Sequence, residues 1–394
     1  MKIFRRAVSI LFIFSILLLA SISHAEIYTG EGKYIMSEGE NLGVAKERAK
    51  ADAMRNACEK AGTYVKSYSR SKNFELEEDI IKTMTANIIK LIEEKFLPYE
   101  QLDNLEGLLI HVIVKAQIDD SDIIRWLKKT DDEKSILVAQ MEALRKANEE
   151  QARQIEELKR QLKNNPQDAE RITQEFADAD KIFLSNQKLD EAKRLTDNGK
   201  RQEAIKIYDE AIELNPNSYW AYYSRGETYG ALGQYDKAVQ DYGKAIQINP
   251  VGYWAYGNRG WIYLNRLGKS DLALADYNKA IELNPNSNQD LCWAYVNRGA
   301  VYGALEKYNE AIQDYNKAIE LNPNYASTYY NRGWLYQNRL GKIDLAIQDY
   351  SKFISLNPNY LWAYQNRGLC YQALGDAVKA QADFEKAKQL GYNG

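Results

Sequence analysis

Apolar and polar positions in the first third of the chain follow two different periods. Residues 27–36 alternate and residues 108–118 contain a continuous apolar run, so both segments predict β-strands. Residues 40–61 are rich in Ala, Lys and Glu and predict a helix that ends at the next residue, a glycine. Residues 63–68 alternate again and predict a further strand. Strands and helices mixed in this way indicate a small α+β domain over residues 26–129.

A charged stretch over residues 131–164 has an apolar stripe with alternating steps of four and three. This spacing is that of the core positions in a coiled coil, with Glu, Lys and Arg on the other faces. Two interpretations stay open: a homodimer through residues 131–164, or a single solvated linker helix. Pro166 ends this helix, and residues 168–184 predict a helical lead-in to the last part of the chain. The stripe consists of Leu137, Met141, Leu144, Asn148, Gln151, Ile155, Leu158 and Leu162.

Residues 185–394 repeat themselves about six times. The phrase Leu-Asn-Pro or Ile-Asn-Pro recurs, and its prolines are 34, 35, 38 and 35 residues apart. Each period contains two helical segments, and the Asn-Pro pair ends the second of them. These prolines are Pro216, Pro250, Pro285, Pro323 and Pro358.

Each period resembles the tetratricopeptide repeat (TPR) family. With the proline at position 32, Gly falls at position 8, Ala at 20 and 27, and Tyr at 11 and 24. The resemblance implies helical hairpins that nest because small residues allow close approach. The expected fold is mainly α, an α–α superhelical solenoid preceded by the small α+β domain and the coiled-coil linker. The matching residues in two periods are Gly226, Gly299, Tyr229, Tyr302, Ala238, Ala311, Tyr242, Tyr315, Ala245 and Ala318.

The N-terminal domain resembles that of flagellar assembly protein T. The resemblance rests on the strand with Gly30-Glu31-Gly32, the Ala-rich helix at residues 45–53, and residues 57–64 after it. It implies a role in envelope assembly or docking and supplies no catalytic residues. The alternative is a plain globular cap for the rest of the chain.

The first 25 residues have the order of a secretory signal peptide. Basic residues come first, an apolar run at residues 7–20 comes next, and small residues stand at Ser23 and Ala25. We expect cleavage after Ala25, and a periplasmic or secreted protein. The alternative is an uncleaved N-terminal anchor. The run is too short for a comfortable membrane span, and no later stretch is apolar enough to cross a bilayer, so we expect no integral membrane span after signal cleavage.

Charge and composition exclude several function classes. The net charge is −3, and loss of Lys2, Arg5 and Arg6 with the signal segment makes it −6, which argues against nucleic acid as a partner. Two histidines and three scattered cysteines cannot form a His-rich metal site, a Ser-His-Asp triad or a disulfide framework. With no phosphate-binding glycine loop either, we expect no enzyme activity and no cofactor.

The last five periods have Arg at position 7 and Asp 16 or 17 residues later. In a helical hairpin these positions lie opposite each other, so we predict ion pairs within each repeat. The pairs are Arg225 with Asp241, Arg259 with Asp276, Arg298 with Asp314, Arg332 with Asp349, and Arg367 with Asp383.

Tryptophan and asparagine recur on the first helix of each repeat, which lines the concave face in the family. Successive amides can bond the backbone of an extended peptide, and indoles supply apolar area. We therefore predict binding of an extended, largely uncharged peptide. Packing between adjacent first helices is the alternative for these residues; carbohydrate binding and a self-assembling envelope component are alternative functions. The candidates are Trp220, Trp254, Trp261, Trp293, Trp334, Trp362, Asn258, Asn297, Asn331 and Asn366.

Overall fold

A computed structural model describes most of the chain, which divides into two compact units at Asp190/Glu191. The predicted signal peptide before Ala25 lies outside the described residues, as do Leu137, Met141, Leu144, Asn148 and Leu162 of the coiled-coil stripe. The described residues are 25–36, 40–71, 81–82, 84–86, 89–98, 100–101, 108–128, 146, 149–151, 153–161, 168–283 and 288–392.

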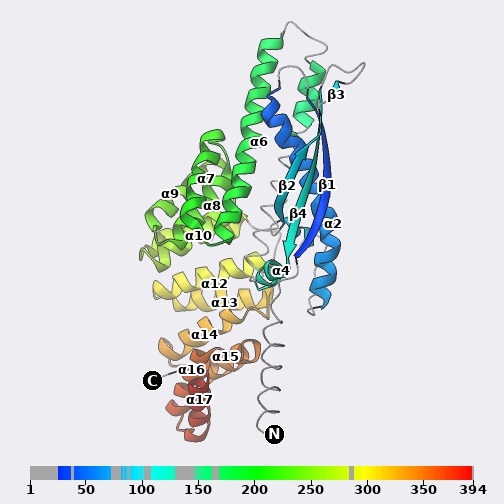
Figure 1. The fold of residues 1–394 in the computed structure, drawn as a ribbon. Coiled ribbons are helices and arrows are strands. Elements are labelled where there is room, and N and C mark those ends of the chain that lie inside the picture. The colour runs from blue at the N-terminus through cyan, green and yellow to red at the C-terminus, as the bar shows by residue number, and fades with distance from the viewer. Residues whose placement is uncertain are drawn as a thin grey trace, which may run out of the picture. The chain divides into compact units, whose positions relative to one another are not determined.

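The first unit contains an antiparallel sheet with strand order β1–β4–β2 (Figure 1). Its central strand is β4 (Leu108–Asp119), which pairs with β1 (Ala25–Met36) along its whole length. Strand β2 (Lys90–Phe96) pairs with the other edge of β4, as does the short β3 (Glu100–Gln101). Helix α4 (Asp120–Leu127) begins directly after β4. The two strands predicted at residues 27–36 and 108–118 are therefore confirmed.

Helix α2 (Leu42–Ser71) covers one face of this sheet and has a spine of alanines. Ala45, Ala49, Ala53, Ala57 and Ala61 are fully buried at four-residue spacing. The helix lies so close to β1 that the strand needs glycine beneath it. A Cβ atom on its first glycine (residue 30) would lie 1.9 Å from the carbonyl oxygen of Ala53, and one on the second (residue 32) 2.0 Å from that of Ala49. The two glycines of the Gly-Glu-Gly sequence therefore allow α2 to pack closely against β1.

The strand predicted at residues 63–68 is wrong, because α2 continues through Gly62 to Ser71. The buried Val65 extends the four-residue spacing of the alanine spine by one more step. Burial of that apolar stripe outweighs the cost of one glycine inside a helix, about 1 kcal/mol. The alternation at residues 63–68 is too short to overrule the helical period.

Three polar side chains of α2 hydrogen-bond the backbone of the β1 edge. Asn56 Nδ2 donates to the carbonyl oxygen of Glu31 at 2.5 Å, and Lys60 Nζ donates to that of Thr29 at 2.7 Å. The amide of Lys33 donates to Asp52 Oδ2 at 3.4 Å. These side chains lie four residues apart on α2. They occupy backbone groups that an edge strand otherwise offers to another chain.

The second half of the coiled-coil stripe packs within the chain. Ile155 and Leu158 are buried against Ile172, Phe176 and Ala179 of helix α6 (Ala169–Asp197). Gln151 on the same stripe is buried and donates a hydrogen bond to the carbonyl oxygen of Ala179. The surface that a dimer needs is therefore already used at these positions. Helix α6 contains the predicted lead-in and continues beyond it.

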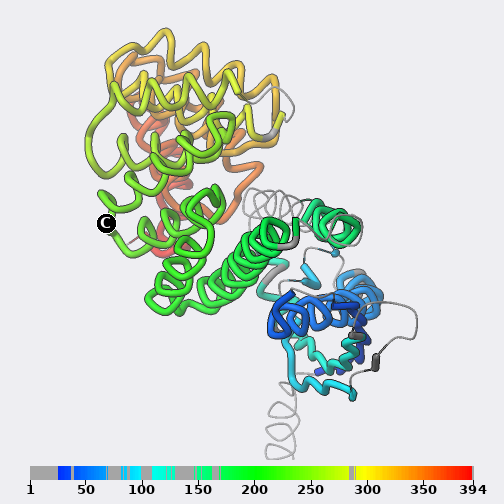
Figure 2. Tube along the Cα trace, turned by 90° about the horizontal axis from the view of Figure 1, so that it is seen from above, coloured from blue at the N-terminus to red at the C-terminus, as the bar shows by residue number. Residues whose placement is uncertain are grey.

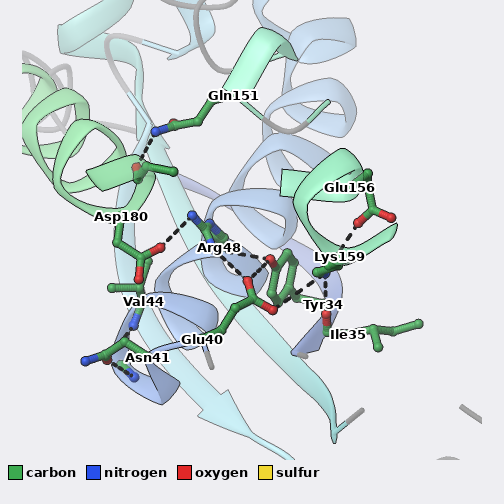
Figure 3. A network of polar contacts seen from close by, with 12 residues as sticks. Tyr34, Ile35, Glu40, Asn41, Val44, Arg48, Gln151, Glu156, Lys159 and Asp180 are labelled. Atoms are coloured by element: carbon green, nitrogen blue, oxygen red, sulfur yellow. Dashed lines mark hydrogen bonds and ion pairs between the residues drawn. The ribbon is translucent and has the colours of Figure 1, made fainter. Parts of the chain in front are cut away.

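A buried polar network joins β1, α2, α6 and the helical residues 153–161 (Figure 3). Arg48 of α2 lies between two carboxylates: its Nη1 is 2.9 Å from Glu40 Oε1, and its Nη2 is 2.8 Å from Asp180 Oδ1. Lys159 donates to the carbonyl oxygen of Ile35 at 2.7 Å and lies 4.5 Å from the centroid of the Tyr34 ring. Burial raises the pKa of Asp180, and the charge of Arg48 opposes that rise.

The second unit is a row of helical hairpins, and Figure 2 shows them in succession along the chain. The first helix of each repeat packs against its second helix, and each second helix packs against the first helix of the next repeat. This confirms the predicted α–α solenoid. Helix α7 (Arg201–Leu214) precedes five pairs: α8 (Tyr219–Ala231) with α9 (Tyr235–Ile248), α10 (Tyr253–Asn265) with α11 (Ser270–Leu283), α12 (Asn288–Ala304) with α13 (Tyr308–Leu321), α14 (Ala326–Asn338) with α15 (Ile343–Leu356), and α16 (Leu361–Ala373) with α17 (Ala377–Gln389).

The turn between the two helices of a repeat needs a residue in the left-handed region. Glycine fills this position in most turns, with φ between 63° and 79°. In the α12–α13 turn the position is Glu306, with φ 61°. Glu306 is the one non-glycine residue with positive φ in the part of the chain that the structure describes. The glycines concerned are Gly199, Gly233, Gly268, Gly341 and Gly375.

Candidate functional site

Close approach within each repeat occurs at the position-8 glycine. A Cβ atom on Gly226 would lie 3.1 Å from the ring of Tyr242, and one on Gly299 would lie 2.8 Å from the ring of Tyr315. From the repeat pattern alone we expect the position-20 alanine across from this glycine. At Gly226 and Gly299 the nearest neighbour is instead the aromatic ring at position 24, which covers the space where a larger side chain would stand.

All five predicted ion pairs form, each with two parallel hydrogen bonds. In Arg298 and Asp314, for example, the Nε–Oδ2 and Nη2–Oδ1 distances are both 2.8 Å. The Asp side chains of the five pairs are 6–8% exposed and the Arg side chains 17–20%. The hydrogen bond to Asp314 raises the pKa of Arg298 although burial opposes it. These buried, bidentate pairs fix the geometry of the hairpins and offer no free charge to a ligand.

The guanidinium groups also bind the preceding repeat, at position 25 of its second helix. Arg225 Nη1 lies 2.6 Å from Asp209, and Arg298 Nη1 lies 2.9 Å from Asn278. Arg332 bonds Asn316 in the same way, and Arg367 bonds Ser351 at 2.9 Å. Position 25 before Arg259 is a glycine, residue 243. This contact was not predicted, although a polar residue at position 25 before four of the five arginines was a signal for it.

Three of the candidate tryptophans are buried or half-buried. Trp254 is 6% exposed, and its ring centroid lies 6.2 Å from that of Trp293. Trp293 contacts Tyr277 at 5.9 Å and fills the space above Gly257, where a Cβ atom would lie 2.5 Å from the indole. Trp220 is half-buried, with its ring edge-on to Tyr223 at 5.5 Å. The buried Trp254 and the Trp293 ring beside it fit the packing alternative, whereas Trp220 contacts aromatic rings of its own helix.

The other three tryptophans are exposed on the first helices of their repeats. Trp261 of α10 is 38% exposed, Trp334 of α14 is 42% exposed, and Trp362 of α16 is 48% exposed. Trp362 lies edge-on to Tyr392 near the end of the chain, at 5.4 Å. An indole costs free energy when water surrounds it, and these three positions do not fill the interior of a hairpin.

Two of the asparagines at position 6 bind the first helix of the preceding repeat. Asn258 donates to the hydroxyl of Tyr223 at 2.8 Å, and Asn366 donates to that of Tyr330 at 3.1 Å. Burial raises the pKa of Tyr330 to about 12.

The remaining two asparagines make no side-chain hydrogen bond to the preceding repeat among the described residues. Asn297 donates to the carbonyl oxygen of Trp293, one turn earlier, at 2.8 Å. Asn331 is half-buried and makes no side-chain hydrogen bond within the described part of the chain. The three bonded amides act as donors in these contacts.

The described residues include no group of three or more His, Cys, Asp or Glu side chains that could hold a metal ion. Within the same residues, no helix is long and apolar enough to cross a bilayer.

Family models match nearly the whole repeat region. Models described as "Tetratricopeptide repeat" match residues 219–250, 255–287, 292–325, 314–348 and 350–382, and one described as "TPR repeat" matches residues 192–233. Residues 192–382 therefore consist of tetratricopeptide repeats, as the proline spacing predicts. These matches begin at residue 192, and the resemblance of the N-terminal unit to flagellar assembly protein T stays a prediction. No curated protein matches the chain.

Solved structures of other repeat proteins are similar to part of this chain. MamA is 30% identical, with 42% of this chain and 93% of MamA covered and a TM-score of 0.38. PilW, titled a widely conserved type IV pilus biogenesis factor, is 22% identical, and the match covers 53% of this chain and 93% of PilW with a TM-score of 0.48. YrrB, titled a TPR protein with an unusual peptide-binding site, is 22% identical, and the match covers 47% of this chain and 92% of YrrB with a TM-score of 0.37.

Proposed function

We propose that residues 185–394 bind an extended peptide segment of a partner protein on the first helices of the repeats. In this proposal the chain is an exported interaction scaffold of the cell envelope. The observation that carries it is the exposure of Trp261, Trp334 and Trp362 on those helices. Tryptophan is enriched among the residues that dominate protein interfaces, because it buries a large apolar area while its indole N–H bonds a polar partner.

Two further features support a peptide as the ligand. The asparagines at position 6 recur once per repeat, and an amide can hydrogen-bond the C=O and N–H groups of an extended backbone. The buried ion pairs and the nested glycines make each hairpin rigid, so little conformational entropy is lost when the ligand binds.

Export is the second part of the proposal. It rests on the basic residues, apolar run and small residues that precede position 26. Partners then come from the periplasm, the membrane surfaces that face it, or the outside of the cell. Detection of the chain in a periplasmic or culture fraction, with an N-terminus at Glu26, tests this part by itself.

The binding proposal is tested with peptide arrays made from envelope proteins, probed with the full chain and with a Trp261→Ala, Trp334→Ala double variant. We expect the variant to lose at least tenfold in affinity for captured peptides, with unchanged helical content. The matched control is Leu272→Ala, Leu345→Ala, which removes exposed apolar side chains (48% and 38%) from the second helices of the same two repeats. Equal loss in both variants, or none in either, refutes a site on the first helices.

Carbohydrate binding is the second candidate, because exposed indoles also stack on sugars. It predicts signals on a glycan array that the Trp261→Ala, Trp334→Ala variant loses. Self-assembly through residues 131–164 is a third candidate. Since Ile155 and Leu158 already pack against α6, such a dimer depends on the part of the stripe outside the described residues. Light scattering of the full chain and of a Leu137→Ser, Leu144→Ser variant tests it.

A further inference from the structure

Two repeats present the same set of exposed side chains. The α10–α11 repeat and the α14–α15 repeat share many residues 73 positions apart, among them a tryptophan, an asparagine, an arginine and a leucine with exposed side chains. These eight side chains are exposed. The repeat between them has Ala300 in place of the tryptophan and, counted from the position-8 glycine, Leu305 in place of the arginine. The four pairs are Trp261 and Trp334, Asn265 and Asn338, Arg266 and Arg339, and Leu272 and Leu345.

In both repeats the arginine lies over the tryptophan ring. The guanidinium carbon of Arg266 is 5.1 Å from the centroid of the Trp261 ring, and that of Arg339 is 5.6 Å from the Trp334 ring. Arg266 also lies 5.4 Å from the ring of Tyr235. Such cation–π contacts hold the flat guanidinium in place with its N–H groups toward solvent. We call each unit of Trp and Arg a Trp–Arg pair.

These two arginines differ from the five at position 7. Each of those five is bound to an aspartate within its repeat. Arg266 and Arg339 have no carboxylate within ion-pair distance among the residues that the structure describes. They are therefore two oriented cations, next to two exposed indoles, on a chain whose net charge is negative.

We infer that the bound peptide carries two acidic side chains, one for each Trp–Arg pair, each next to an apolar residue. The inference rests on the proposed function and differs from the expectation of a largely uncharged peptide. A preoriented guanidinium binds a carboxylate through two parallel hydrogen bonds, and the indole accepts the apolar neighbour. Because the pairs stand two repeats apart, one peptide that reaches both gains from effective concentration.

The probes are fluorescein-labelled synthetic peptides titrated against the full chain by fluorescence anisotropy. The first series has two Leu-Glu-Leu motifs separated by Gly-Ser spacers of increasing length. A second series has one motif, and a third has Gln in place of both Glu residues. We expect one spacer length at which the two-motif acidic peptide binds at least tenfold tighter than either reference peptide, and an advantage that shrinks at high salt.

The variants are Arg266→Gln, Arg339→Gln and the double variant. Each single change should bring the affinity for the two-motif peptide to that for the one-motif peptide, and the double variant should bind Glu and Gln peptides equally. The matched control is Lys269→Gln, Lys342→Gln, which removes two exposed charges at equivalent positions of the same repeats. A preference for Glu that survives in the double variant, or that the lysine control also loses, overturns the inference.

The arginines also stand at the C-terminal ends of α10 and α14, where a cation favours the helix dipole. A stabilising role alone predicts a lower Tm and no change in the ratio of Glu to Gln affinity, which again overturns the inference. Failure of the inference differs from failure of the proposed function. If Glu and Gln peptides bind the wild type equally and the Trp261→Ala, Trp334→Ala variant binds neither, the proposed site on the first helices is supported and its preference for acidic side chains is refuted. If no peptide from either experiment binds, both fail.

Discussion

Replacement of Glu306 by glycine should stabilise the repeats. Glu306 occupies the left-handed position of the α12–α13 turn with φ 61°, where the other turns have glycine. Its side chain is exposed and makes no hydrogen bond or ion pair within the described part of the chain, so the change removes only a Cβ constraint. The backbone hydrogen bond from the Glu306 amide to Gly303, at 3.2 Å, does not depend on the side chain.

The magnitude comes from two opposing backbone terms. A residue with a Cβ atom in the left-handed region costs about 1–2 kcal/mol. Glycine removes that cost from the folded state, but its greater freedom stabilises the unfolded chain by about 0.4–1 kcal/mol. The net stabilisation is therefore about 0.5–1 kcal/mol, equivalent to a rise in Tm of roughly 1–4 °C for a unit of this size.

The assay is urea unfolding measured by circular dichroism at 222 nm, with a thermal melt beside it. The reciprocal variant Gly233→Glu is the control, because a Cβ atom on Gly233 meets nothing within 4 Å and any effect comes from the backbone. We expect its free energy of unfolding to fall by a similar amount. If Glu306→Gly lowers the midpoint, or if Gly233→Glu leaves it unchanged, the account of the turns is refuted.

Three further predictions concern the first unit. Gly32→Ala should lower the free energy of unfolding of this unit by about 3 kcal/mol in urea, because the new methyl group would lie 2.0 Å from a carbonyl oxygen of α2. The control is Gly62→Ala, which should not destabilise the unit, because the nearest atom to the new methyl group would be 3.9 Å away. Arg48→Ala should cost about 3–5 kcal/mol at neutral pH by the same assay, since it removes the guanidinium between the buried carboxylates of Glu40 and Asp180, while Lys159 stays 3.7 Å from Glu40. Asn56→Ala, Lys60→Ala should increase self-association in light scattering, because it uncovers the edge of β1.

The fold was largely predictable because small residues recur at fixed spacing. The glycine and alanine periods indicated the helical hairpins, and the Arg and Asp spacing predicted all five ion pairs. Gly62 misled the prediction because a helix tolerates glycine when its other residues bury an apolar stripe. Val65, four residues after Ala61, was the signal that the helix continues.

The candidate site was less predictable, because a position number within a repeat does not fix exposure. Trp254, Trp293 and Trp362 share position 2, yet the first is buried and the last is 48% exposed. The exposure of each indole depends on the residue that the neighbouring repeat places against it. Gly257 occupies a position where other repeats have Tyr, Val or Gln, and it makes the space into which Trp293 fits.

The orientation of Arg266 over Trp261 could not be predicted from the sequence either. The two residues are five positions apart and meet because the arginine is the C-terminal cap of α10, where the backbone leaves helical geometry. Helical periodicity alone would not bring them together.

The central claim is that a peptide lies on the first helices of the repeats, and hydrogen–deuterium exchange of the full chain tests it most directly. The measurement compares the chain alone with the chain saturated by the tightest peptide from the array. The account predicts slower exchange in α10, α14 and α16, with α11, α15 and the first unit unchanged. Protection confined to the second helices, or to the first unit, would contradict it.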